Sequence, residues 1–332
     1  MRPTRHCCFA RRQISVMRVS FFVQAYNTEA FVGECLSSIL DQRGGFTFDV
    51  LVIDDASTDR TAREIERFND PRVEFREHTH NKGAIATANE GYLSVTGDFV
   101  VRVDSDDRLR PDFLEQTVPR LLEAPSRGLV YGDIATIDPA GHVTRPGGLI
   151  HRDGRLSTAD EFFPLLMENF IPAPSTMVRR EALLPLLPIP SRFRFLDWYL
   201  TTGIAQTWEC CYVDAVLAEY RVHSGNMHRA MVLDRTGEAT SLQILDRLFS
   251  EDVRREEKAR WRQRVYARHY LTYADKYFGF DMNADARRCY WQAIARQPSL
   301  LLDAGVVRRL AATIVGRTMY ESAKAHLAGG RS

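Results

Sequence analysis

The segment Phe99-Val-Val-Arg-Val-Asp-Ser-Asp-Asp-Arg108 joins a short apolar run to a cluster of acids. Its first half is typical of a buried strand, and the carboxylates of Asp104, Asp106 and Asp107 follow directly. Crowded carboxylates repel one another, and a hard divalent cation bound through oxygen offsets that repulsion while keeping sites for phosphate. A polar turn before a helix at Pro111 is the structural alternative, and the segment alone does not choose between the two.

The chain before this segment repeats one pattern, in which short apolar runs alternate with helical periodicity. Predicted strands cover Val19–Ala25, Phe48–Ile53 and Val73–Arg76, and Phe99–Val103 is the fourth. Helices are predicted between them, over Phe31–Leu40, after Ser57-Thr58-Asp59, and over Ala84–Val95. Strands that alternate with helices imply right-handed βαβ units on a parallel sheet. Open sheets of this kind bind ligands at the carboxyl ends of their strands.

The second half of the chain changes from this alternation to a long helical region. The predicted sheet domain is completed by a helix over 111–122, strands over 129–137, 176–179 and 211–222, and a helix over 195–206. From about residue 238 the periodicity is helical, and one aromatic stripe, Tyr266, Tyr270, Tyr273 and Tyr277, predicts a packed helical core. The predicted fold class is α/β, a mostly parallel Rossmann-like sheet flanked by helices and followed by a C-terminal α-helical region.

Three regions are expected: residues 1–16 as a disordered basic extension, 17–228 as the sheet domain, and 229–332 as the helical region. The extension is rich in arginine and lacks the apolar core of a signal peptide. No stretch of the sequence approaches the roughly 20 apolar residues that span a bilayer. The six cysteines show no CxxC spacing, which argues against a zinc site or a disulfide framework. A reducing compartment, and so a cytoplasmic location, is expected.

Composition places the chain among soluble globular proteins and bears on its partners. The 332 residues include 44 Lys and Arg against 43 Asp and Glu, a formal net charge of +1, so no nucleic acid partner is expected. The Arg-rich start and the segment 251–264 leave peripheral contact with the inner face of a membrane open, although a solvated helix face is the simpler interpretation of 251–264. Homo-oligomerisation is also left open.

Two further polar clusters follow predicted strands. Asp54 and Asp55 come at the end of the strand Phe48–Ile53, where a carboxylate can accept hydrogen bonds from a nucleobase imide or a ribose hydroxyl. A helix cap is the alternative, but Ser57 or Thr58 suffices for one. Asn81-Lys-Gly83 and Asn89-Glu-Gly91 are turn-forming sequences. The sequence contains neither a G-x-G-x-x-G dinucleotide fingerprint nor a P-loop.

Taken together, these segments resemble glycosyltransferase family 2. The stretches Val19–Asn27, Leu51–Asp59, Asn81–Gly91 and Val101–Asp107 occur in the order and spacing of that family. Phe195-Leu-Asp-Trp-Tyr199 resembles its acidic-Asp-Trp segment, and Ala218-Glu-Tyr-Arg-Val-His-Ser-Gly225 resembles its Tyr-Arg-x-His strand end. The similarity covers roughly residues 17–228. It implies a GT-A fold and transfer of a sugar from a nucleotide-sugar donor.

The resemblance also implies roles for individual residues. Asp104-Ser105-Asp106 is similar to the family's metal-binding DxD motif, and Asp197 takes the place of the catalytic base. Asp104, Asp106 and His223 are the candidate ligands of a divalent cation, Mn²⁺ or Mg²⁺. The candidates for binding the nucleotide sugar are Ala25, Tyr26, Asn27, Asp54, Asp55, Asn81, Gly83, Asn89, Asp104, Ser105 and Arg179. A structural role is the alternative for His223 and Arg179, and the first turn of a surface helix is the alternative for Asp197.

The expected reaction is inversion at an anomeric carbon by direct displacement, with the cation stabilising the departing diphosphate and Asp197 accepting the proton of the acceptor hydroxyl. The expected donor is a UDP-sugar, and the acceptor a glycan, a lipid-linked sugar or a cell-surface polysaccharide. One alternative is a metal-dependent nucleotidyltransferase, which usually shows a Gly-rich loop with Lys or Arg after the first strand; Val19–Asn27 has none. The other is a catalytically inactive GT-A-like carbohydrate-binding or scaffolding protein.

Overall fold

The computed structural model describes residues 17–148, 150, 160–223 and 228–315. The predicted basic extension 1–16 lies outside these residues. Contacts divide the described chain into two compact units. The first contains 17–165, 169–191 and 196–223, and the second contains 166–168, 192–195 and 228–315.

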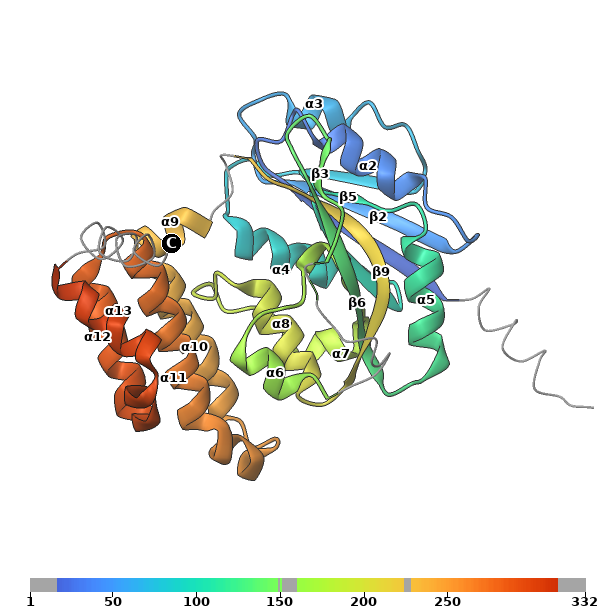
Figure 1. Cartoon of the computed structure of the whole chain (residues 1–332). Coiled ribbons are helices and arrows are strands. Elements are labelled where there is room, and N and C mark those ends of the chain that lie inside the picture. Colours follow the sequence, from blue (N-terminus) through green and yellow to red (C-terminus); the bar gives the residue numbers. More distant parts are fainter. Residues whose placement is uncertain (1–16, 149, 151–159, 224–227, 316–332) are drawn as a thin grey trace, which may run out of the picture. The chain divides into compact units, whose positions relative to one another are not determined.

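Within the described residues, the first unit is built on one nine-stranded sheet (Figure 1). Its strands are β1 (Arg18–Ala25), β2 (Thr47–Asp54), β3 (Val73–Glu77), β4 (Phe99–Asp104), β5 (Arg108–Leu109), β6 (Arg127–Ile137), β7 (Val143–Arg145), β8 (Met177–Arg179) and β9 (Glu209–Arg221). Their spatial order is β3-β2-β1-β4-β8-β6-β9-β5, and β7 pairs with β6. Strands β3, β2, β1 and β4 run parallel to one another, as β6 and β9 do.

The predicted α/β class and the four parallel strands of the first half are confirmed, but the sheet as a whole is mixed. The short strand β8 lies between β4 and β6 and runs antiparallel to both. Strand β5 likewise pairs antiparallel with β9. The antiparallel strands lie beyond the four parallel strands of the first half. The carboxyl ends of β1, β2 and β4 share one edge.

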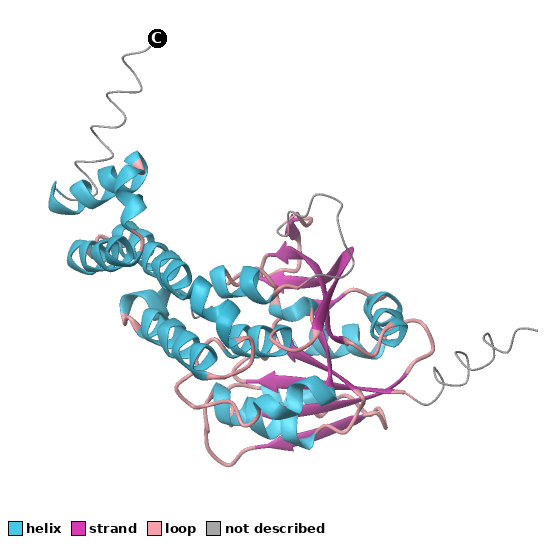
Figure 2. Ribbon diagram, turned by 90° about the horizontal axis from the view of Figure 1, so that it is seen from below, coloured by secondary structure: helices cyan, strands magenta, loops and turns pink. Residues whose placement is uncertain are grey.

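Helices cover both faces of this sheet, as Figure 2 shows. They are α2 (Val32–Leu40), α3 (Thr61–Ile65), α4 (Ala84–Ser94), α5 (Phe113–Glu123), α6 (Phe162–Met167), η1 (Ala173–Ser175), α7 (Arg180–Leu183), η2 (Leu184–Leu186) and α8 (Leu196–Ala205). Alternate residues of β1 face opposite sides. Phe21 belongs to the apolar core that includes α2 and α5, whereas Phe22 packs edge-on against Tyr92 of α4.

The second unit is helical. Its helices are α9 (His228–Leu233), α10 (Thr236–Ser250), α11 (Arg255–Gly279), α12 (Asn283–Arg296), η3 (Pro298–Leu302) and α13 (Ala304–Val315). The predicted tyrosine stripe is confirmed as core, because Tyr266, Tyr273 and Tyr277 are buried and Tyr270 packs against the same cluster. None of the described helices is both long enough and apolar enough to cross a membrane.

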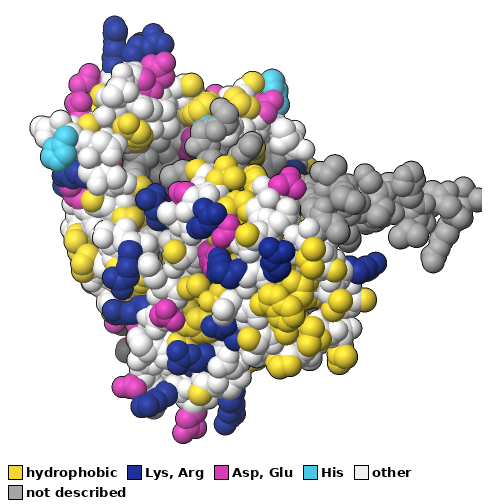
Figure 3. Space-filling view, turned by 90° about the vertical axis from the view of Figure 1, so that its left-hand side faces the viewer, with side chains coloured by type: hydrophobic (Ala, Val, Ile, Leu, Met, Phe, Trp, Pro, Cys, Tyr) yellow, Lys and Arg dark blue, Asp and Glu magenta, His cyan; other side chains and the backbone are white. Residues whose placement is uncertain are grey.

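The near-zero net charge of the chain conceals two regions of opposite charge. Residues 17–224 hold 21 Lys and Arg against 31 Asp and Glu, whereas residues 225–332 hold 19 against 12. Figure 3 shows Lys and Arg side chains spread over one face of the molecule. The acidic excess therefore belongs to the part of the sequence that contains the carboxylate clusters.

We expect acid to destabilise the second unit through His269. This side chain is buried, and its Nε2 lies 2.8 Å from the carbonyl oxygen of Leu166. Burial lowers the pKa of His269 from 6.5 to about 4, and the neighbouring Lys276 and Arg268 act in the same direction, against the hydrogen bond to Leu166 and the charge of Glu168. Between these pH values the unfolded chain binds a proton that the folded chain does not, so stability is full above pH 6.5 and falls below it.

The expected loss between pH 7 and pH 5 is about 2 kcal/mol of unfolding free energy from this one histidine. Urea unfolding of the full chain at the two pH values measures it. His269→Gln should remove that part of the pH dependence. His142→Gln is the matched control, because the His142 side chain is 80% exposed and its removal should leave the slope unchanged. Equal slopes for all three proteins would contradict the assignment.

Candidate active site

The polar residues singled out in the sequence follow the carboxyl ends of three adjacent strands. The register pairs Ala25 of β1 with Asp54 of β2, and Gln24 of β1 with Asp104 of β4. The three strands therefore end level with one another. Their following loops carry Tyr26 and Asn27, Asp55 to Thr58, and Ser105 to Asp107 along one edge of the sheet.

Asp54 is the last residue of β2 and Asp55 follows it, and both are buried. The carboxylate of Asp54 accepts hydrogen bonds from the backbone N–H and the hydroxyl of Ser57, which closes the turn after the strand. The carboxylate of Asp55 accepts the backbone N–H groups of Lys82 (2.8 Å) and Gly83 (2.9 Å) and lies 2.8 Å from Nδ1 of His78. Asp55 thus fastens the 81–83 loop to the end of β2.

The loop held by Asp55 begins helix α4. Gly83 has φ +85°, a left-handed conformation that side chains disfavour, and it directs its N–H toward the carboxylate. The side-chain amide of Asn81 donates to the backbone oxygen of Asp55 at 3.1 Å. Burial by itself would raise the pKa of Asp55, but the hydrogen bonds from His78, Lys82 and Gly83 outweigh it and lower that pKa. The carboxylate is therefore ionised and fully engaged by the protein.

Replacing Asp55 by Asn should destabilise the first unit. The amide keeps one acceptor oxygen and turns an N–H₂ group toward a backbone donor, so at least one charge-assisted hydrogen bond is lost, at about 2 kcal/mol of unfolding free energy. Urea denaturation measures the loss. Glu77→Gln is the control, because Glu77 is an exposed carboxylate at the end of β3. An Asp55→Asn protein as stable as the control would show that the 81–83 loop is held by other contacts.

The loops after β1 and β2 are joined to each other. Asn27 has φ +52°, a conformation that Asn tolerates better than most residues. Its Oδ1 accepts the backbone N–H of Thr58 at 2.8 Å, and its own N–H donates to Oγ of Ser57 at 2.9 Å. Tyr26 beside it is 47% exposed, and Ala25 is buried with its carbonyl oxygen bonded to the N–H of Asp55. Tyr26 is therefore a ring at this edge that a planar ligand can stack on.

The carboxylates of the DxD segment point in different directions. Both oxygens of Asp104 accept hydrogen bonds from the guanidinium of Arg102, at 2.6 and 3.1 Å. Asp106 Oδ2 lies 2.9 Å from Nε2 of His223. Strand β4 ends at Asp104, and the N–H of Asp107 donates to the Asp104 carbonyl oxygen, so the chain turns here. The hydroxyls of Ser105 and Thr28 lie 2.9 Å apart and tie this turn to the loop after β1.

Arg221, the last residue of β9, holds this turn through hydrogen bonds. It is fully buried, and its Nε donates to the backbone oxygen of Asp106 at 2.8 Å. Its backbone N–H donates to the carboxylate of Asp107 at 2.9 Å, and its Nη2 donates to Glu34 at 2.7 Å. Because His223 follows two residues later, the same strand end that supports the turn also brings the imidazole to Asp106.

The electrostatics of this turn favour a bound cation. Burial and the neighbouring Asp104 raise the pKa of Asp106, although His223 opposes the shift. Burial together with Asp106 and Asp104 raises the pKa of Asp107 well above its ordinary value. One oxygen of Asp107 is buried without a hydrogen-bond partner. A divalent cation would offset the negative charge that raises these pKa values.

The residues present fit a divalent cation as a partial ligand set. Asp106 supplies carboxylate oxygen and His223 supplies imidazole nitrogen, a combination suited to Mn²⁺ among the oxygen-preferring ions. Across the part of the chain that the structure describes, no three His, Cys, Asp or Glu side chains come together as a complete metal site. Asp106 and His223 would therefore hold the ion jointly with oxygens of a diphosphate and water.

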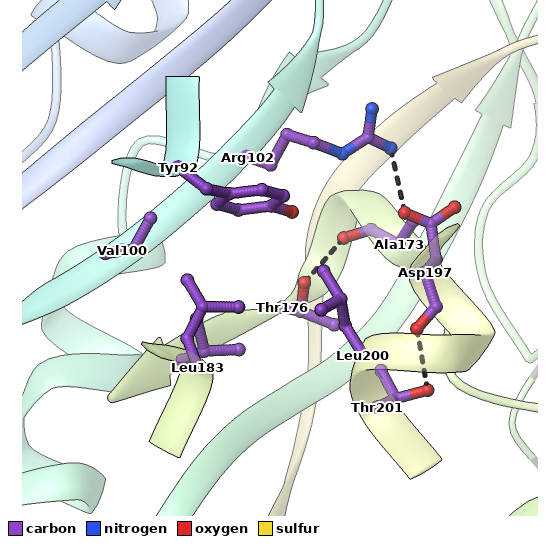
Figure 4. A pocket seen from close by; sticks show the side chains of 10 residues that line it. Tyr92, Val100, Arg102, Ala173, Thr176, Leu183, Asp197, Leu200 and Thr201 are labelled. Atoms are coloured by element: carbon purple, nitrogen blue, oxygen red, sulfur yellow. Dashed lines mark hydrogen bonds and ion pairs between the residues drawn. The ribbon is translucent and has the colours of Figure 1, made fainter. Parts of the chain in front are cut away.

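Asp197 lies in the first turn of α8, near the carboxylates of β4. Its Oδ1 accepts a hydrogen bond from Nη2 of Arg102 at 2.9 Å, as Figure 4 shows. The next residue, Trp198, is buried, and its indole N–H donates to the carbonyl oxygen of Leu165 at 2.7 Å, which fixes the start of the helix. The Asp197 side chain is 34% exposed and so remains accessible to a ligand.

A small cavity lies behind Arg102 and Asp197. Its volume of about 20 Å³ is enough for roughly one water molecule. Arg102 and Asp197 line its polar side, and Tyr92, Leu183 and Leu200 line its apolar side (Figure 4). The Asp197 carboxylate and the Arg102 guanidinium thus form a polar part of the lining, and much of the remaining lining is apolar.

Two predicted nucleotide-sugar ligands, Arg179 and Asn89, have their polar groups bonded to backbone. Arg179 pairs with Phe99, the first residue of β4, at the opposite end of the strand from Asp104. Its guanidinium donates to the carbonyl oxygens of Arg127 (3.0 Å) and Leu121 (2.6 Å). Asn89 exchanges two hydrogen bonds with the backbone of Ile189. Arg179 therefore lies away from the edge where the other candidates gather, and the side-chain amide of Asn89 is engaged by the backbone.

Arg102 was not among the sequence candidates, although it bonds two of them. A signal for it was present, since an arginine in the otherwise apolar run Phe99–Val103 needs a buried partner. Arg221 lies in the Tyr-Arg-x-His stretch, but the sequence gives it no role of its own, and His78 is not among the candidates. Each acts through the backbone or through another side chain, and residue type alone does not predict such a role.

Comparisons with known proteins agree on a family and a fold. A sequence profile described as Glycosyl transferase family 2 matches residues 20–185. The succinoglycan biosynthesis protein ExoO of Rhizobium meliloti is 35% identical over 121 residues, which are 36% of this chain and 34% of that protein. The chain matches about a third of the length of the first curated relatives.

Solved structures resemble nearly the whole chain. S. aureus TarS 1–349 in complex with UDP-GlcNAc has a TM-score of 0.53 at 17% identity, over 89% of this chain and 91% of TarS. The mannosyltransferase PcManGT from Pyrobaculum calidifontis, in complex with GDP-Man and Mn²⁺, has a TM-score of 0.56 at 17% identity, over 95% of this chain and 88% of that one. At these identities the resemblance shows a shared GT-A-type fold.

Proposed function

Since the chain belongs to glycosyltransferase family 2, we propose that it transfers a sugar from a nucleotide-diphosphate sugar to a hydroxyl group of a glycan acceptor, with inversion. The observation that carries the proposal is the grouping of Asp197 with Arg102 and Asp104, at the sheet edge where Asp106 meets His223. A candidate base and a candidate diphosphate site then face one reacting carbon. The proposed donor is a UDP-sugar, and the relatives' names support a polysaccharide or lipid-linked acceptor.

The nucleotide is proposed to lie along the ends of β1 and β2. Tyr26 offers an exposed ring for the base, and Asn27, Asp54, Asp55, Asn81 and Gly83 shape the surface around it. Asp54 and Asp55 use their carboxylates within the protein, so their contribution is to fix the two loops. Asn89 and Arg179 are left out of this surface because their polar groups bond backbone elsewhere.

The reaction needs a base on the side of the sugar opposite the diphosphate. The acceptor oxygen forms a bond to the anomeric carbon as the bond from that carbon to the diphosphate oxygen breaks. The proton of the acceptor hydroxyl passes to Asp197, whose carboxylate is accessible and oriented by Arg102. Asp106 and His223, with Asp104 nearby, would hold Mn²⁺ or Mg²⁺, and the ion would supply Lewis-acid stabilisation of the departing diphosphate. Arg221 keeps Asp106 and His223 together by holding the turn.

A screen of nucleotide-sugar hydrolysis tests the proposal. The purified chain is incubated with Mn²⁺ and a panel of UDP-, GDP- and dTDP-sugars, and release of nucleoside diphosphate is measured. We expect one UDP-sugar to be turned over above the others, and faster when an acceptor glycan is added. Turnover of none of the donors would favour the inactive carbohydrate-binding alternative. Pyrophosphate release from a nucleoside triphosphate and a sugar phosphate would favour the nucleotidyltransferase instead.

A further inference from the structure

Arg102 is a buried cation in the middle of the sheet. Its side chain is only 10% exposed, and β1 pairs with β4 so that Phe22 lies opposite it. Strand alternation places Arg102 and Asp104 on the same face, two residues apart. Taking a charge out of water is costly unless it is paired, so the side chain needs carboxylate partners. Its two partners are Asp104 of β4 and Asp197 of α8.

The contacts of Arg102 form a fork. Its Nη1 and Nη2 donate to the two oxygens of Asp104 at 2.6 and 3.1 Å, and Nη2 also donates to Asp197 Oδ1 at 2.9 Å. Asp104 belongs to β4, and Asp197 begins α8, 95 residues after Arg102. A planar guanidinium has a fixed geometry of donors. The two carboxylates are consequently held at one separation and one orientation.

The surroundings leave this arrangement little freedom. The guanidinium of Arg102 is largely buried and is paired with the carboxylates of both Asp104 and Asp197. Leu183, Leu200 and the ring of Tyr92 line the cavity beside the pair (Figure 4). Asp104 is in addition held by the pairing of β4 with β1, and Asp197 lies in the first turn of α8.

We propose that Arg102 is a positioning residue, which holds the Asp197 carboxylate at a fixed place beside Asp104 so that it meets the acceptor hydroxyl. This inference rests on the proposed function and adds a residue to it. Arg102 acts through Asp197 and does not itself bind the nucleotide. Its loss should therefore slow turnover without weakening the binding of UDP, because the Asp106–His223 pair is supported separately by Arg221.

The experiment compares the wild-type protein with Arg102→Met and Arg102→Lys. A displacement of about 1 Å in a reacting group can cost 10²-fold in rate, so Arg102→Met should lower kcat by roughly a hundredfold. Lysine keeps the charge but cannot make the fork, so Arg102→Lys should recover only part of kcat, about tenfold below wild type. The KM for the donor, and the Kd for UDP with Mn²⁺ by calorimetry, should stay within about threefold of wild type in both variants.

Arg127→Met is the matched control for a structural role. The Arg127 side chain is 12% exposed, pairs with Glu123 at 2.7 Å, and lies at the start of β6, away from the candidate site. It should lose stability but keep kcat. Wild-type kcat in Arg102→Lys would overturn the proposal, as would loss of UDP affinity in parallel with kcat. If Arg102→Met does not fold, Arg102→Lys decides. Failure of the proposed function is distinct, because the wild type itself would then turn over no donor.

Discussion

Asp197→Asn should reduce kcat for sugar transfer by roughly 10²–10⁴-fold, the range that a positioned general base contributes. The asparagine amide occupies nearly the same volume and can still accept the hydrogen bond from Arg102, which Asp197 receives at 2.9 Å. It cannot take up the proton of the acceptor hydroxyl. The substitution therefore removes the proposed chemistry while leaving the shape of the site almost unchanged.

The measurement separates chemistry from binding. Transfer is followed by release of nucleoside diphosphate at saturating donor, and UDP binding with Mn²⁺ is followed by calorimetry. We expect the Kd for UDP to change by less than about threefold, because Asp197 is proposed to act on the acceptor hydroxyl, and a pure loss of transition-state interaction appears in kcat. Retained turnover in Asp197→Asn would remove this residue as the base.

A control for Asp197→Asn is needed because an acid in the first turn of a helix also stabilises that helix through the dipole. Glu115 occupies the same kind of position in α5 and is exposed. Glu115→Gln should therefore carry any dipole effect without the catalytic one. If both variants lost kcat to the same extent, a general loss of stability would explain the result better than removal of a base.

The sequence was sufficient to predict the first half of the sheet. In Val19–Ala25, Phe48–Ile53 and Phe99–Val103, apolar runs long enough for a strand alternate with amphipathic helices, and that alternation predicts right-handed βαβ units on a parallel sheet. The same reasoning predicted that Asp54 and Asp104 lie at one edge, since parallel strands end together. Strand β8 could not be predicted in its place, because its antiparallel pairing with β4 depends on contacts far apart in the sequence.

The directions in which individual side chains point could not be predicted from the sequence. Simple alternation would place Asp104 and Asp106 on the same side, but β4 ends at Asp104 and the turn re-aims Asp106 toward His223. Arg179 was a reasonable phosphate ligand by residue type, yet its strand pairs with the wrong end of β4. Asp55 has the chemistry of a nucleotide ligand, but its carboxylate is engaged by the 81–83 loop. In each case a tertiary contact, either a strand pairing or a hydrogen bond, determines where the side chain lies.

Asp106→Ala should abolish metal-dependent binding of UDP. Asp106 and His223 are the pair proposed to hold the cation, and their side chains are each 21% exposed, so both face solvent at the sheet edge. Outer-shell partners of a metal are typically worth 10–100-fold in affinity, so loss of a charged ligand should raise the Kd for UDP with Mn²⁺ by at least about a hundredfold. Binding of UDP without metal should be weak and equal in both proteins.

Calorimetry measures the Kd for UDP of wild type, Asp106→Ala and His223→Ala, each with and without Mn²⁺. A metal ligand is recognised by a variant in which Mn²⁺ no longer strengthens UDP binding. Asp41→Ala removes an exposed carboxylate after α2 and controls for net charge. Burial and the neighbouring Asp104 raise the pKa of Asp106, against the bond to His223, and urea denaturation of each variant therefore accompanies the calorimetry. Reduced affinity with preserved stability would therefore report on the metal. If UDP binds equally well with and without Mn²⁺, and Asp106→Ala leaves the Kd unchanged, the metal does not reach this turn.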